Sequence, residues 1–121
     1  MVVQKYEDLI VWQKAMDLVV EIYALVKLLP DEERYTLVDQ MKRAAVSIPS
    51  NIAEGQERST AKNFVHFLHI AKGSRSELET QLSICVRLNY LTLEQIVIAK
   101  SLLAETGKML HSLIQKLSTN H

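Results

Sequence analysis

The chain has 121 residues and a mass of 13.8 kDa, the size of a single domain, and it contains only three Gly and two Pro. Fourteen Lys and Arg residues balance fourteen Asp and Glu residues, so the net charge does not favour a general attraction to nucleic acid or to membranes. The single cysteine, Cys85, excludes an internal disulfide and a cysteine-based zinc site.

Turn residues are too rare for an all-β domain, which needs a turn every 8–12 residues. Residues 1–8 have no basic segment followed by an apolar one, so they are unlike a secretory signal. Apolar runs such as Leu9–Trp12 are far shorter than the roughly 20 residues that span a membrane. We therefore expect a helical, cytoplasmic protein without a membrane partner.

The first predicted helix covers about residues 8–29. Asp8 suits the N-cap, and Pro30 disfavours helical backbone in the residue before it. The second covers about residues 34–56 and places one apolar stripe at helical spacing: Leu37, Met41, Ala44, Ile48 and Ile52. Because the stripe continues past Pro49, we expect this proline to kink the helix and not to end it.

The third predicted helix covers about residues 60–88 and opens at Ser59 and Thr60. The fourth covers about residues 93–118, after the capping-box pattern of Thr92 and Gln95. Connections this short make consecutive helices antiparallel. The sequence therefore predicts an all-α protein, an antiparallel up-down-up-down four-helix bundle that forms one domain over residues 1–121.

The first helix is more apolar than one buried face requires. Sixteen of the 21 residues from Leu9 to Leu29 are apolar, whereas a helix buried on one side needs about three in seven. We expect the surplus to form an interface between copies of the chain, although the residues before this helix could also cover it. The predicted interface residues are Ile10, Val11, Leu18, Ile22 and Leu25.

Polar residues interrupt the stripes of the second and third helices. Counting outward from the turn near Arg58 places Arg43 close to Glu77, and a pair in a dry setting would make Arg43→Ala cost several kcal/mol. The same counting places Asn51 level with the indole of Trp12. This candidate polar layer either sets the helix register or binds a ligand; it comprises Arg43, Ser50, Asn51, Glu54, Arg58, Ser74, Glu77 and Gln81.

Charge is unevenly distributed along the chain. Residues 1–39 hold four basic and eight acidic side chains, whereas residues 40–75 hold six basic and two acidic ones. In an oligomer the two segments could meet across the interface, or the basic segments could line a ring and contact phosphate. The candidate phosphate contacts are Lys42, Arg58, Lys62, Lys72 and Arg75.

Catalytic and cofactor motifs are missing from the sequence. A di-iron bundle needs Glu-x-x-His on two helices, and this pattern does not occur. His66 and His69 could share a helix face, but an exposed position explains them more simply. Cys85 lies on the third apolar stripe, so a core position suits it better than a nucleophile. We expect no enzyme activity, no cofactor and no bound metal.

Three segments make the sequence recognisable. They are Asp8–Ala15 (DLIVWQKA), Gln40–Gly55 (QMKRAAVSIPSNIAEG) and Gly73–Leu82 (GSRSELETQL). Together they closely resemble the four-helix-bundle proteins first noticed as reading frames inside intervening sequences of bacterial 23S rRNA genes. The resemblance covers about residues 6–91.

The resemblance implies an up-down bundle that assembles as a homo-pentamer with a central channel. It implies no established activity. Family members have been suspected of binding RNA or DNA, and a related bundle is an accessory protein of the reverse transcriptase in diversity-generating retroelements. We expect a homo-oligomeric scaffold or interaction module, associated with nucleic acid. The alternative is a bundle that binds a small ligand or a metal through the candidate polar layer.

Overall fold

The structure is a computed structural model that describes residues 5–119. Within this range the chain forms helices α1 (Ile10–Val26), α2 (Leu37–Glu57), α3 (Ala61–Arg87) and α4 (Val97–Thr119), together with short 3₁₀ helices at Tyr6–Asp8 and Asp31–Glu33. The described residues contain no β strand, so the all-α prediction with four helices is confirmed. None of these helices is both long and apolar enough to cross a membrane.

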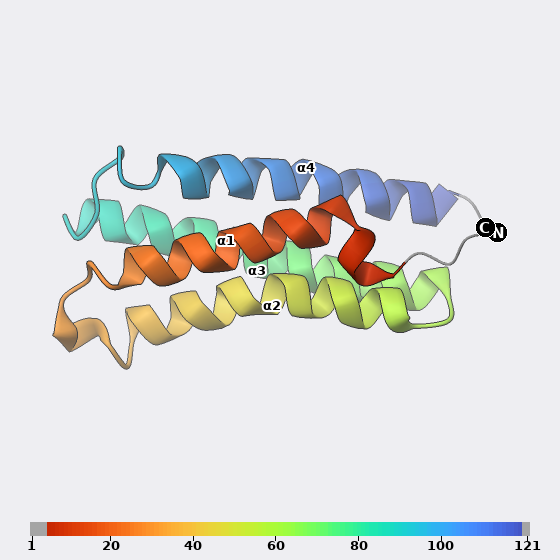
Figure 1. Cartoon of the computed structure of the whole chain (residues 1–121), viewed down its shortest axis with the longest axis horizontal. Helices are drawn as coiled ribbons and strands as arrows, with labels where there is room; N and C mark the ends of the chain where they lie inside the picture. The colour runs from red at the N-terminus through yellow and green to blue at the C-terminus, as the bar shows by residue number, and fades with distance from the viewer. Residues whose placement is uncertain (1–4, 120–121) are drawn as a thin grey trace.

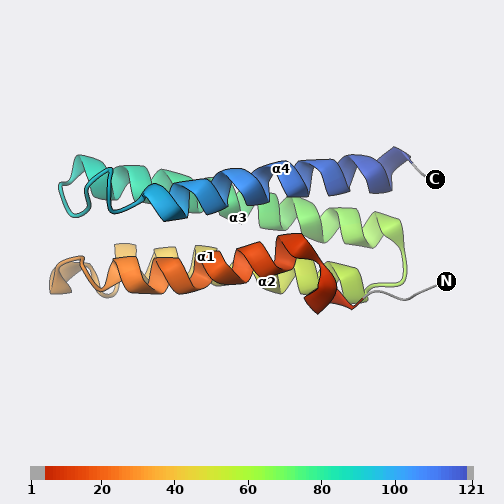
Figure 2. The ribbon, with the colours of Figure 1, turned by 45° about the horizontal axis from the view of Figure 1, so that its top comes forward.

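The four α helices lie side by side along the long axis of the molecule (Figure 1). Helix α1 packs against α2 and α4, and helix α3 packs against the same two helices. Figure 2 shows the helices in two layers, with α1 beside α2 and α3 beside α4. The α1–α2 and α3–α4 connections lie at one end of the bundle, and the α2–α3 turn lies at the other (Figures 1 and 2).

The starts of helices α1 and α2 differ from the predicted ones. Asp8 belongs to the first 3₁₀ helix, and Leu9 occupies the α1 N-cap without a side-chain hydrogen bond, so the predicted Asp8 cap is wrong. Helix α2 starts three residues later than predicted because Asp31–Glu33 form a separate 3₁₀ turn. Helix α2 continues through the buried Pro49 to Glu57, and the kink expected there stays a prediction.

Side-chain caps precede helices α3 and α4. Thr60 accepts a hydrogen bond from the backbone N–H of Asn63 at 3.2 Å. Thr92 and Gln95 form the predicted capping box, with backbone-to-side-chain distances of 2.9 and 3.1 Å. Helix α4 nevertheless begins at Val97, because the next backbone bond, from Val97 to Glu94, is still that of a turn.

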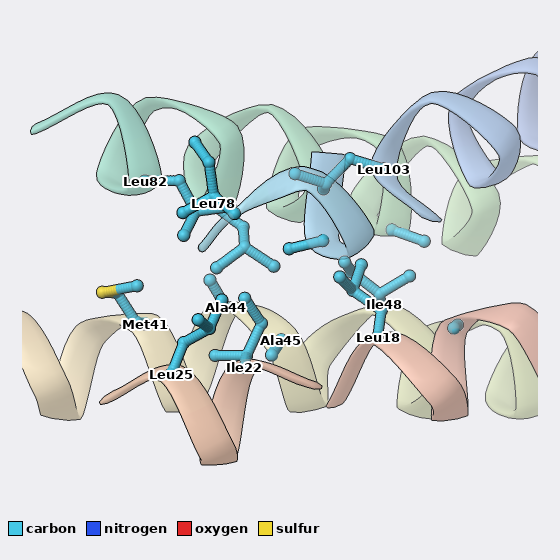
Figure 3. Packing of buried hydrophobic residues seen from close by; sticks show 14 of the residues in the cluster. Leu18, Ile22, Leu25, Met41, Ala44, Ala45, Ile48, Leu78, Leu82 and Leu103 are labelled. Atoms are coloured by element: carbon cyan, nitrogen blue, oxygen red, sulfur yellow. The ribbon is translucent and has the colours of Figure 1, made fainter. Parts of the chain in front are cut away.

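Most of the predicted oligomer interface lies in the core of the single chain. Leu18 and Ile22 are fully buried, and Val11 and Leu25 are each 5% exposed. Figure 3 shows Leu18 and Ile22 in the packed interior. Four of the five predicted interface residues are therefore wrong; only Ile10 is exposed. The reason is helical phase, since Val11, Leu18, Ile22 and Leu25 form the stripe of α1 that faces the other three helices.

The apolar surplus of the first helix is real, but it lies on other residues. Val20 is 70% exposed, Ile10 62% and Leu28 54%, and Met16 and Tyr23 are also exposed. Met16, Val20 and Tyr23 recur at helical spacing opposite the buried stripe, so they share one outward face. A helix with two apolar faces covers one of them with its own bundle and leaves the other to solvent.

Candidate functional site

A small polar network joins α2 to α3 in the middle of the bundle. The hydroxyls of Ser47 and Ser74 are 2.7 Å apart. The Asn51 amide donates to the Ser47 hydroxyl at 2.9 Å and to the Ser47 carbonyl at 2.8 Å. This Ser47–Asn51–Ser74 network satisfies polar groups that are partly buried, and it fixes the register between the two helices.

The predicted contact between Arg43 and Glu77 is wrong. The Arg43 side chain is 79% exposed, and its Nε is 2.9 Å from the Asp39 carboxylate one turn earlier on the same helix. Glu77 is exposed on α3. Pairs of this exposed kind contribute about 1 kcal/mol at most, so the condition for a large cost of Arg43→Ala, a dry pair with Glu77, is not met.

Asn51 and Ser50 point to different neighbours. Counting along the helices placed Asn51 level with the indole of Trp12. In the structure the Asn51 amide instead donates to Ser47. Trp12 instead contacts the Tyr6 ring edge-on at 5.4 Å. Ser50 lines a groove of about 340 Å³ between α1 and α2, together with Trp12.

The remaining members of the candidate polar layer are also dispersed. Glu54 pairs with Arg58 at 2.7 Å, and the Arg58 guanidinium lies over the Phe67 ring at 5.0 Å. Gln81 is only 5% exposed, and its Oε1 lacks a hydrogen-bond partner among the described residues. The structure thus brings Asn51 and Ser74 together through Ser47, and pairs Glu54 with Arg58, but does not assemble the eight predicted residues into one site.

Arg75 connects α3 to α4 and is held inside the structure. Its Nε donates to the Leu103 carbonyl at 2.6 Å, and a terminal nitrogen lies 3.4 Å from the Glu79 carboxylate. Its side chain is only 17% exposed. Gly107 makes room for it, since a Cβ at that position would lie 2.6 Å from the Arg75 Nε. Arg75 therefore joins α3 to α4, and its prediction as a phosphate contact stays a prediction.

The other candidate phosphate contacts occupy different settings. Lys42 lies 5.0 Å from the centre of the Tyr23 ring, and Arg58 is paired as described above. Lys62 is exposed and Lys72 half-buried, and within residues 5–119 neither forms an ion pair.

A second hydrogen-bonded cluster joins the two connections at one end of the bundle. The Tyr90 hydroxyl donates to Glu33 at 2.8 Å, and the Thr36 hydroxyl donates to the same carboxylate at 2.6 Å. The bonds from Thr36 and then Tyr90 lower the pKa of Glu33. The bond to Glu33 and burial raise the pKa of Tyr90. The sequence did not suggest this contact, because its partners lie 57 residues apart in two irregular connections.

Ionisable groups divide unequally between the two layers. Residues 1–58, which include α1 and α2, carry seven Lys and Arg and ten Asp and Glu. Residues 59–121, which include α3 and α4, carry seven Lys and Arg but four Asp and Glu. A neutral chain therefore folds into an acidic α1–α2 layer and a basic α3–α4 layer (Figure 2).

Exposed apolar side chains occur on both layers, and four of them lie on neighbouring parts of α1 and α2. Met16 and Val46 line the same groove, and Tyr23 and Val46 line the neighbouring one. We call Met16, Val20, Tyr23 and Val46 the α1–α2 apolar face. A separate groove of about 400 Å³ between α1 and α4 is lined mainly by apolar side chains, including Ile10 and Leu113.

Metal-ligating side chains form no cluster in the described range. No group of three or more His, Cys, Asp or Glu residues between positions 5 and 119 could hold a metal ion. The exposed His66 contacts the edge of the Phe67 ring. Cys85 is fully buried with its Sγ 3.6 Å from the Met41 Sδ, and burial raises the pKa of its thiol to about 11. A thiol in this environment belongs to the core.

Comparison with known proteins identifies a family whose model matches most of the chain. The model of the 23S rRNA-intervening sequence protein family matches residues 7–112. A solved structure with a TM-score of 0.81 and 30% identity covers 88% of this chain and 99% of its own. It is described as a protein of unknown function from the S23 ribosomal protein family of Bacteroides thetaiotaomicron. No curated protein sequence matches the chain.

Proposed function

We propose that this chain, which belongs to the 23S rRNA-intervening sequence protein family, is a non-enzymatic bundle that self-associates and serves as an interaction module. The observation that carries the proposal is the α1–α2 apolar face. Contiguous apolar surface is uncommon on soluble monomers, and it marks sites of association. A second copy of the chain is the partner that is present wherever the protein is made.

Burial values support this interpretation of the face. Val20 is the most exposed member at 70%, although it lies in the middle of a helix with a fully buried stripe on its other side. Met16, Tyr23 and Val46 are each about 40% exposed beside it. All four apolar side chains keep part of their surface in water. Covering them with a second surface lowers the free energy of the system. The family resemblance suggests five copies around a central channel.

The test of self-association compares two valine variants. Val20 lies on the proposed interface, whereas Val97 is 60% exposed at the start of α4 and lies outside it. Burying a new carboxylate in an apolar interface is costly, so Val20→Glu should dissociate the assembly and Val97→Glu should not. Light scattering at matched concentrations gives the mass of each variant.

We expect the wild type and Val97→Glu to show a multiple of 13.8 kDa, and Val20→Glu to approach 13.8 kDa. Circular dichroism would establish that both variants remain folded. A wild-type mass of 13.8 kDa would overturn the proposal. A Val20→Glu variant that associates as strongly as the wild type would place the interface elsewhere.

We further propose that the assembly contacts nucleic acid. The name of the matching family refers to intervening sequences of 23S rRNA, and the similar structure comes from a family named as ribosomal. The basic α3–α4 layer is the observation in this chain that supports such a contact, because Lys and Arg side chains neutralise phosphates. Salt-dependent binding of labelled RNA to the purified protein tests it.

A further inference from the structure

We propose that the outer surface of the α3–α4 layer binds the phosphate backbone of nucleic acid. This inference rests on the proposed contact with nucleic acid and names the surface that makes it. Binding of this kind needs Lys and Arg side chains that are exposed and not already neutralised by a carboxylate of the same molecule. The two layers of the bundle differ in this respect.

Ion pairs leave the α3–α4 layer with a surplus of cations. Arg75 is held by Glu79, and Glu105 is neutralised by Lys14 of α1 at 3.1 Å. Six other basic residues of this layer form no ion pair within the described part of the chain: Lys62, Lys72, Arg87, Lys100, Lys108 and Lys116. Among the described side chains of this layer, Glu77 and Glu94 are the carboxylates that form no ion pair.

These cations are distributed along the two helices. Lys100, Lys108 and Lys116 follow one another at intervals of eight residues, so each lies about 12 Å further along α4 and about 80° further around it. Lys62 and Arg87 lie near opposite ends of α3, roughly 37 Å apart at the helical rise. The unpaired cations are therefore spread along the length of the layer, as phosphates are along a linear polyanion.

A second copy of the chain is the alternative occupant of this surface. It competes for this surface through the carboxylates of its acidic layer that form no ion pair among the described residues: Glu7, Asp8, Asp17, Glu21, Asp31–Glu33 and Glu57. Asp39 and Glu54, on α2, are already neutralised by Arg43 and Arg58. Apolar contact on the opposite layer is available for self-association, which leaves the basic layer free for a different partner.

Two triple variants with the same change in charge test the surface. The first is Lys62→Gln/Lys100→Gln/Lys108→Gln on the α3–α4 layer. The second is the matched control Lys27→Gln/Arg34→Gln/Arg43→Gln on the α1–α2 layer. All six positions are exposed, and Lys and Gln have similar helix propensities. The readout is the fluorescence anisotropy of a labelled single-stranded RNA of roughly 20 nucleotides, titrated with full-length protein between about 50 and 200 mM salt.

We expect the α3–α4 variant to bind at least tenfold more weakly at about 50 mM salt, with a salt slope smaller by about one for each phosphate contact removed. The control should bind within about twofold of the wild type. Equal losses in both variants, or a loss only in the control, would overturn the proposed surface while leaving nucleic-acid binding intact.

Wild-type protein that shows no salt-dependent binding would overturn the nucleic-acid function itself, and the surface with it. Light scattering on the same variants tests whether the α3–α4 layer instead mediates self-association. If the α3–α4 variant loses self-association while its RNA binding is unchanged, the layer receives a second copy of the chain and the proposal is wrong.

Discussion

At the scale of single residues, the glycines of α2 and α3 differ in whether the structure leaves space for a Cβ atom. A Cβ added at Gly55 would lie 2.8 Å from the Phe67 Cβ and 3.2 Å from the Phe64 carbonyl oxygen. The close approach of α2 to the start of α3 depends on this missing atom. A Cβ added at Gly73 would meet nothing within 4 Å.

Gly55→Ala should therefore destabilise the bundle. Crowding in a packed site lowers the free energy of unfolding by about 1–3 kcal/mol, and the better helix propensity of Ala raises it by only about 1 kcal/mol. We expect a net loss of about 1 kcal/mol in the free energy of unfolding, measured by urea denaturation.

Gly73→Ala is the matched control and should change stability in the other direction. The same gain in helix propensity, up to about 1 kcal/mol, is not opposed by a contact within the chain. If Gly55→Ala were as stable as Gly73→Ala, the close approach near the α2–α3 turn would not limit packing.

At the scale of the helices, α3 and α4 are joined by the side chain of Arg75 lying across Gly107. The bond from Arg75 to the Leu103 carbonyl is short, at 2.6 Å, and partly buried. Hydrogen bonds made by a charged group contribute more than those of neutral pairs. Gly107 serves this contact, since a side chain there would displace the guanidinium.

Arg75→Ala should destabilise the bundle by about 1.5–3 kcal/mol, because it removes a charged hydrogen bond and the packing of the side-chain stem. Gly107→Ala should also destabilise in the wild-type background, because the new methyl group displaces Arg75. In the Arg75→Ala background, Gly107→Ala should be neutral or stabilising. Thermal denaturation of the four proteins gives the coupling energy. Additive effects would show that Gly107 and Arg75 act independently.

The ends of the helices were less predictable than their existence. Periodic stripes identified all four helices, and the predicted ends of α2 and α3 lie within one residue of the observed ones. The starts of α2 and α4 were placed three or four residues early. In both cases a turn with local hydrogen bonds precedes the helix, and local sequence signals do not distinguish such a turn from the first turn of a helix.

At the scale of the whole molecule, the hydrogen bond from Tyr90 to Glu33 ties the α1–α2 connection to the α3–α4 connection. It therefore links the two layers at one end of the bundle. Together with the bond from Thr36, it keeps the pKa of Glu33 below its ordinary value of 4.5. The ionised carboxylate is the form that accepts both bonds, so the link depends on pH.

Glu33→Gln should remove a pH-dependent contribution to stability. A lowered pKa in the folded state stabilises the protein above pH 4.5, and this contribution is lost as the pH falls through the folded-state value. The difference in unfolding free energy between the wild type and Glu33→Gln should thus be largest near neutral pH and should shrink below pH 4.5.

Urea denaturation over a pH series measures this difference, with Glu32→Gln as the control on the neighbouring residue. A difference that is the same at every pH would show that ionisation of Glu33 does not support the link between the connections.

The sequence by itself determined the helical class, the positions of the apolar stripes, the capping box at Thr92 and the family, because these depend on spacing between neighbours in the chain. Only the tertiary structure decided which apolar residues of α1 are buried, that Arg75 reaches the Leu103 carbonyl, and that a neutral chain separates into an acidic and a basic layer. The first two outcomes depend on the rotation of each helix about its axis, and the third depends on which helices lie side by side. Only the packing of all four helices fixes both.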